Sequence, residues 1–221
     1  VCLIAFLMDC ALSCGITVTP FFCFDELGGG ARMSGLIFSF QFGAYAIGSF
    51  LSSPFVTRTR DGLKWALAGG GGFTAFFSLA PTYRSPYFFV LMTLIAMSCM
   101  CTLWASLQSW LGVEPDPWVR GRRVSIFTLS WSAGIAVGSL VAGPLYDVNP
   151  YLPFALLLLL GATGTVLVLT LPPEEELCRP APIVFEDGST EHDQRSERFL
   201  YCAWAANAMG CFLVLATRSV F

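Results

Sequence analysis

The stretch VSIFTLSWSAGIAVGSLVAGPLYD, residues 124–147, decides the fold of this chain. Its first 23 residues carry no formal charge. At about 1.5 Å per helical residue they extend roughly 34 Å, enough to cross a hydrocarbon layer of about 30 Å. Arg120, Arg122 and Arg123 precede the stretch, and Asp147 ends it. Because bases gather on the cytoplasmic side of membrane proteins, we expect the arginine end in the cytoplasm.

The composition of the whole chain agrees with a membrane protein. Of its 221 residues, 55% are hydrophobic and only 12% are charged, whereas a soluble surface needs about 25–35% charged residues. The charges are grouped between long neutral runs, which is typical of a polytopic membrane protein, and no basic stripe for nucleic acid is present. The pattern predicts seven spans: 1–24, 33–57, 65–80, 86–110, 124–146, 151–171 and 199–217.

The basic residues orient these spans. The loops after spans 2, 4 and 6 hold nine bases, and the opposite loops hold three. This ratio predicts a multi-pass integral membrane protein with its N-terminus in the cytoplasm.

An internal repeat relates the first three spans to the next three. Residues 48–55 read GSFLSSPF and residues 138–145 read GSLVAGPL, with three identities at a separation of 90 residues. The first copy lies on span 2 and the second on span 5, which cross the membrane in opposite senses. We therefore expect two inverted three-helix repeats, an internal symmetry typical of secondary transporters. The alternative is that Gly, Ser and Pro are simply common in membrane helices.

Nine cysteines invite a disulfide or zinc interpretation, but eight of them lie in neutral spans, where cysteine behaves as a small hydrophobic residue. We expect no disulfide framework, no metal site and no cofactor. The chain begins at Val1 within a hydrophobic run, so we expect a fragment without a cleavable signal peptide.

Asp9 is the only formal charge within a predicted span. A carboxylate at mid-helix costs on the order of 2.5–3.5 kcal/mol on insertion scales, so it needs a cavity or a partner. It is either a substrate-binding or proton-coupling acid, or an acid near the cytoplasmic mouth whose side chain reaches water.

Other polar and aromatic side chains mark the same set of spans. Gln41 and Tyr45 share one face of span 2, and a similar row on span 4 includes Trp104 and Gln108. Further candidates are Trp131 on span 5 and Asn207 on span 7. Either these residues line a cavity, or the amides bond between helices and the tryptophans pack.

Spans 3 and 6 are poorer in polar residues and contain GGGG and LLLLL respectively. We therefore expect spans 1, 2, 4, 5 and 7 to line one polar cavity, with spans 3 and 6 peripheral. Within it, we expect Gln41 and Trp131 to lie away from either mouth.

The chain resembles the major facilitator superfamily in two motifs. The loop after span 2 is similar to the family signature Gly-x-x-x-Asp-Arg-x-Gly-Arg-Lys through Arg60, Gly62 and Lys64, although Thr59 replaces the Asp. Span 5 resembles the glycine-rich fifth helix, Gly-x-x-x-Gly-Pro-x-x-Gly-Gly, through three helix-packing glycines, with Ser139 in place of the Pro. These glycines are Gly134, Gly138 and Gly143.

The resemblance implies an all-α polytopic bundle of two inverted three-helix repeats plus one further transmembrane helix. Residues 1–171 would form a six-helix N-terminal domain, 172–198 a cytoplasmic interdomain loop, and 199–221 the first helix of a truncated C-terminal domain. The implied function is transport of a small solute by alternating access, either facilitative or driven by an ion gradient. The implied partners are the solute, a coupling proton or ion and the lipid bilayer, in a monomer that is not an enzyme. The alternatives are a non-transporting membrane scaffold or receptor, and a membrane-embedded enzyme.

Overall fold

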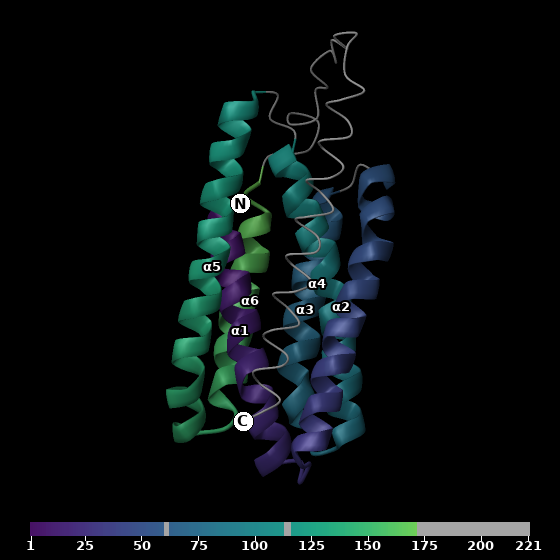
Figure 1. Cartoon of the computed structure of the whole chain (residues 1–221), viewed down its shortest axis with the longest axis vertical. Coiled ribbons are helices and arrows are strands. Elements are labelled where there is room, and N and C mark those ends of the chain that lie inside the picture. Colours follow the sequence, from purple (N-terminus) through teal and green to yellow (C-terminus); the bar gives the residue numbers. More distant parts are fainter. Residues whose placement is uncertain (60–61, 113–115, 172–221) are drawn as a thin grey trace. The chain divides into compact units, whose positions relative to one another are not determined.

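The computed structural model describes residues 1–59, 62–112 and 116–171. This part of the chain consists of six α-helices and one short 3₁₀ turn, Ala80–Thr82 (Figure 1). The helices are α1 (Cys2–Asp25), α2 (Ala31–Thr59), α3 (Gly62–Leu79), α4 (Pro86–Gly112), α5 (Pro117–Val148) and α6 (Leu152–Val168). The predicted all-α architecture is confirmed. Span 7 and the interdomain loop lie outside the described residues.

Helix α5 corrects one predicted boundary. The sequence predicts a loop from 112 to 123, but the helix already begins at Pro117. The Asp116 carboxylate caps it by accepting hydrogen bonds from the backbone N–H groups of Trp118 and Val119, the first at 2.8 Å. Proline suits the first helical position because its missing N–H would have no partner there. A search for uncharged runs misses these residues, because a membrane helix can continue past the hydrocarbon layer into the headgroups.

Four helices are long and apolar enough to cross a membrane by length and composition. They are α1, α4, Ala31–Ser52 of α2 and Trp118–Val148 of α5. Helix α6 is apolar but has 17 residues, or about 26 Å of helix. Helix α3 carries five glycines and Lys64, which lower its hydropathy.

The packing of the helices has an internal symmetry. Helix α1 packs mainly against α5 and α6, whereas α4 packs mainly against α2 and α3, and α3 packs against α6. Figure 1 shows the same neighbours: α1 lies beside α5 and α6, and α2, α3 and α4 lie together. Exchanging α1 with α4, α2 with α5 and α3 with α6 leaves this list of neighbours unchanged.

The glycines at the start of the sequence repeat occupy equivalent places. A Cβ atom added to Gly48 of α2 would lie 2.9 Å from the Cys101 sulfur of α4. A Cβ atom added to Gly138 of α5 would lie 3.0 Å from the Cys10 Cα of α1. Cys10 and Cys101 are 91 residues apart, nearly the separation of the two glycines. The helix contacts therefore follow the same repeat that the eight-residue match predicts.

Helices α3 and α6 meet through a reciprocal pair of glycines and threonines. Gly70 of α3 faces Thr165 of α6, and Gly161 of α6 faces Thr74 of α3. Each threonine hydroxyl donates a 2.8 Å hydrogen bond within its own helix, to the Gly70 or Gly161 carbonyl four residues earlier. Gly70 and Gly161 are 91 residues apart, as are Thr74 and Thr165, so the symmetry axis runs between α3 and α6. Small residues allow two membrane helices to approach closely here.

An aromatic cluster anchors the C-terminal end of α1. The ring of Phe22 lies 5.4 Å from Phe89 of α4, 5.2 Å from Phe154 of α6 and 5.8 Å from Tyr151, measured between ring centroids. Phe22, Phe89 and Phe154 are almost completely buried. Stacked and edge-to-face pairs of this kind add about 0.5–1.5 kcal/mol each beyond their burial. The cluster fixes the end of α1 and so the rotation of its polar face.

Candidate functional site

Asp9 lies at the centre of the candidate site. Its side chain is 1% exposed, and among the described residues neither carboxylate oxygen has a hydrogen-bond partner. Helix α5 approaches it closely, because a Cβ added to Gly134 would lie 3.2 Å from the Asp9 Cβ. Asp9 is thus buried inside the bundle and does not reach water in this conformation. A buried carboxyl without a partner retains its full capacity to accept or donate a hydrogen bond.

Gln41 of α2 is a second buried polar group. Its side chain is fully buried, and neither its amide nitrogen nor its amide oxygen has a hydrogen-bond partner in the described part of the chain. An unpaired buried amide costs about 1–3 kcal/mol in mutational data, so it marks a place where a ligand or water is favourable. The two predicted polar residues share this property, which no other aspartate or glutamine of the described segments has.

Trp131 occupies the place on α5 that Gln41 occupies on α2. The two residues are 90 apart, as are Gly48 and Gly138. Trp131 is half-buried, whereas Gln41 is fully buried. The repeat thus has an amide at this position of α2 and an aromatic side chain at the corresponding position of α5.

An aromatic contact joins α4 to α5. The indole of Trp104, 7% exposed, meets the ring of Phe127 edge to face with centroids 6.0 Å apart. Tyr45 of α2 is half-buried, and its backbone carbonyl accepts a 3.1 Å bond from the Cys101 thiol. Gln108, one turn beyond Trp104, is exposed. The row predicted on α4 therefore runs from the interior to the surface.

A polar row that the sequence-based prediction does not include lies between α1 and α5. Ser13 is buried and Thr17 is half-buried on α1, and the Thr17 hydroxyl donates a 3.3 Å hydrogen bond to the Ser139 hydroxyl of α5. We call Asp9, Ser13, Thr17 and Ser139, together with the glycines opposite them, the α1–α5 seam. The spacing of four residues from Asp9 to Ser13 to Thr17 was the signal that could have identified it.

The glycines predicted to pack helices divide into two groups. Gly134 and Gly138 lie directly against the α1 backbone, where an added Cβ would approach the carbonyl oxygens of Phe6 and Cys10. Gly143 does not: none of the described atoms lies within 4 Å of the place where its Cβ would be. The packing role predicted for Gly143 thus has no partner among the described residues and stays a prediction. The motif match located the residue correctly but not the face of α5 on which it lies.

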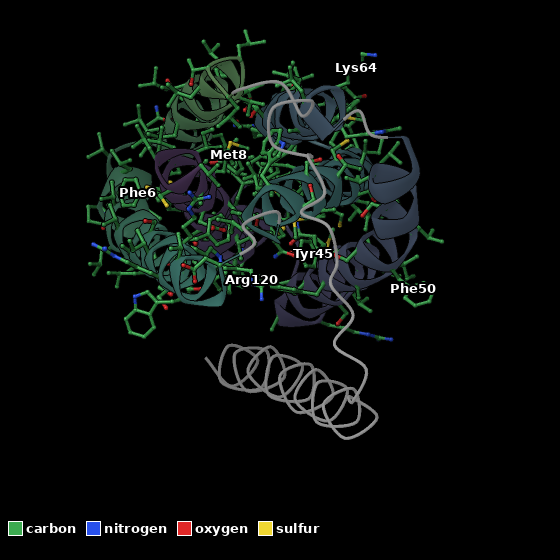
Figure 2. The ribbon with its side chains drawn as sticks, turned by 90° about the horizontal axis from the view of Figure 1, so that it is seen from above. Phe6, Met8, Tyr45, Phe50, Lys64 and Arg120 are labelled. Carbon is green, nitrogen blue, oxygen red and sulfur yellow. The ribbon has the colours of Figure 1, made fainter. Side chains whose placement is uncertain are left out.

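The remaining candidates lie at the start of α3 or outside the described residues. Gly62 is buried at the start of α3, and Lys64 is exposed and lies at the rim of the bundle (Figure 2). Arg60 and Asn207 lie outside the described residues. Figure 2, which looks along the helices, also shows Met8 pointing into the bundle and Phe50 pointing away from it.

In the described ranges, no three His, Cys, Asp or Glu side chains come together in a group that could hold a metal ion. Their six cysteines are free thiols. Cys99 faces α3, near Gly72, whereas Cys101 faces α2, near Gly48, as their spacing predicts.

Comparison with known families assigns the chain to a protein family. The family model of the Major Facilitator Superfamily matches residues 1–220. The chain belongs to this superfamily, whose members are membrane transporters of small solutes. A search of curated proteins and a search of solved structures each gave no match. The chain is thus an integral, multi-pass membrane protein with an all-α bundle.

Proposed function

We propose that this protein moves a small solute across the membrane by alternating access, with Asp9 and Gln41 in the binding site. The proposal is carried by one observation: both side chains are buried, and neither has a hydrogen-bond partner among the described residues. A bound solute or a coupling proton would supply those partners. Tyr45, Trp104, Gln108, Trp131 and Asn207 are the further residues that we assign to the site.

The helix contacts support a mechanism in which helices move as units. Gly134 and Gly138 bring α5 against the backbone of α1, and Gly48 brings α2 against α4. Contacts between backbones are smooth and carry few interlocking side chains, so one helix can slide or tilt on the other. Small-residue interfaces of this kind are common in membrane bundles.

We propose the arrangement of domains that the sequence predicts. In it, residues 1–171 would form the N-terminal bundle, 172–198 would be a cytoplasmic loop and 199–221 would be the first helix of a second domain. The N-terminus lies in the cytoplasm, and the protein acts as a monomer. Arg60, together with Gly62 and Lys64 at the start of α3, forms the cytoplasmic motif that we expect to change its contacts during the cycle.

Transport by the reconstituted protein tests the proposal. Proteoliposomes with an imposed pH gradient are incubated with a panel of neutral, anionic and cationic solutes, and the accumulated solutes are identified by mass spectrometry. We expect one solute class to accumulate, and both Asp9→Asn and Gln41→Leu to abolish its uptake. Thr163→Val is the matched control, because the Thr163 hydroxyl lies exposed on α6 and bonds the Leu159 carbonyl of its own helix.

The same assay separates the other two functions. A scaffold or receptor would bind a solute at the vesicle surface without accumulating it, and an embedded enzyme would return a chemically altered solute. Uptake that persists in both Asp9→Asn and Gln41→Leu would remove these residues from the site.

A further inference from the structure

The polar row of the α1–α5 seam leads away from Asp9 in one direction. Asp9, Ser13 and Thr17 succeed one another at four-residue intervals, and Ser139 adds a hydroxyl 3.3 Å from Thr17. Four residues of helix rise about 6 Å. A water molecule that bonds two oxygens at about 2.8 Å each bridges a gap of nearly this length. Each turn of α1 therefore offers one step for a proton carried by a hydroxyl and a water.

The opposite direction along α1 offers no such steps. The preceding positions at the same interval are Ala5 and Val1. Neither has a polar side chain, and Ala5 is completely buried. Asp9 is therefore connected by hydroxyl groups only to the end of the bundle where α1 and α5 finish.

That end carries an acid and a phenol at the continuation of the row. Asp25, exposed at the C-terminal end of α1, accepts a 3.0 Å hydrogen bond from the Tyr146 hydroxyl of α5. Phe21 lies between Thr17 and Asp25 on the same face of α1, and its ring centroid is 6.0 Å from that of Tyr146. Phe21, which is 54% exposed, and Tyr146 thus lie between the hydroxyl row and the exposed carboxylate along α1 in this conformation.

The symmetry-related helix pair has no equivalent row. Positions 9, 13 and 17 of α1 correspond, at a separation of 91 residues, to Met100, Trp104 and Gln108 of α4. Met100 has no exchangeable proton, and the buried Trp104 fills the middle position in contact with Phe127. The hydroxyl row is therefore a property of one half of the repeat and not a consequence of the symmetry.

We propose that the α1–α5 seam is the path by which Asp9 exchanges its proton with water at the Asp25 end, with Phe21 and Tyr146 as its gate. This inference rests on the proposed function only for the role of the proton in transport. The path itself does not depend on that function. In each step an O–H bond of a water or hydroxyl breaks and an O–H bond forms on the next oxygen. At the last step the Asp9 carboxylate gains the proton, and no electrons are transferred.

Few other charged or titratable groups face this path. The Cys10 thiol adjoins Asp9 on α1 itself, and α5 contributes only Tyr146 between Val124 and Tyr146. At the mouth, Glu26 pairs with Arg84 at 2.9 Å beside the Asp25–Tyr146 bond. Spans 33–57 of α2 and 152–168 of α6 have no formal charge. Asp9 is therefore the carboxyl that accepts a proton at the inner end of the α1–α5 seam.

Infrared spectroscopy of the full chain in proteoliposomes tests this path. The carbonyl stretch of a protonated Asp9 is identified as the band that Asp9→Asn removes, and its shift after exchange into D₂O gives the rate of proton exchange. We expect Thr17→Val to slow this exchange about tenfold, the scale of one lost hydrogen-bonded step. Tyr146→Phe, which removes the bond to Asp25, should accelerate it.

Thr19→Val is the matched control. Thr19 is a buried threonine of the same helix, but its hydroxyl bonds the Gly15 carbonyl at 2.9 Å and lies off the seam. Its exchange rate should equal that of the unaltered chain. Equal rates in Thr17→Val and Thr19→Val, or the absence of an Asp9 band at any pH at which the protein is folded, would overturn the path. Loss of solute uptake with the exchange pattern intact would instead refute only the proposed function.

Discussion

A methyl group at Gly138 has no room between α5 and α1. In the Gly138→Ala variant the new Cβ would lie 3.0 Å from the Cys10 Cα and closer still to the Cys10 carbonyl oxygen. Carbon atoms prefer separations of about 3.5–4.0 Å, so the two helices must move apart by roughly 1 Å. Backbone atoms cannot move aside as a flexible side chain does. Overpacking of this kind costs about 1–3 kcal/mol.

Gly143→Ala provides the matched control on the same helix. No described atom lies within 4 Å of its added Cβ. Alanine is favoured over glycine in a helix by about 0.8–1.0 kcal/mol, so this variant should be as stable as the unaltered chain or slightly more stable. The same gain partly offsets the clash at Gly138. We therefore expect the two variants to differ by about 1–3 kcal/mol, with Gly138→Ala the less stable.

Thermal unfolding in detergent measures this difference, with a dye that fluoresces on reaction with the cysteine thiols exposed by unfolding. For a chain of this size, 1 kcal/mol corresponds to about 2–4 °C in Tm. We expect Gly138→Ala to melt at least this far below Gly143→Ala. Equal melting temperatures would show that α1 and α5 do not pack through Gly138, and the symmetry argument based on it would fail.

Three further predictions concern other parts of the bundle. Asp116→Ala should destabilise α5 by about 1 kcal/mol, because Asp116 caps its N-terminus, and chemical denaturation should detect the loss. The Arg84–Glu26 pair should show no measurable coupling in a double-mutant cycle, because the Arg84 side chain is 69% exposed; a clear coupling would mean that the pair is buried in the membrane-embedded protein. A cysteine at Thr59 should resist an impermeant reagent added outside intact cells, and rapid labelling would reverse the proposed orientation.

The sequence predicted the helices well because their signal is local. An uncharged run of about 20 residues can satisfy its backbone in lipid only as a helix, so composition alone locates most of each helix. The start of α5 was missed because the Asp116 cap and the arginine-bearing first turns lie outside the uncharged run. The repeat was predicted from eight residues, because inverted copies keep their helix-contact glycines at nearly constant separation.

The candidate site was predicted in part. Asp9 and Gln41 could be identified from sequence because a polar side chain in a neutral span is rare and costly. Their burial without partners could not, because burial depends on which face of each helix meets its neighbours. The lack of a described neighbour at Gly143 has the same origin, since the motif fixes the residue but not the rotation of α5.

The sequence by itself determined the class of fold, the number and order of the described helices, and the one carboxyl placed within the predicted spans. These depend on local hydrophobicity and on the cost of charge in lipid, which act residue by residue. Only the tertiary structure decided that Ser13, Thr17 and Ser139 form one row with Asp9, and that Trp104 fills the equivalent place in the other half. The Thr17–Ser139 contact joins residues 122 positions apart, and the packing of glycines against the α1 backbone sets it rather than any local preference.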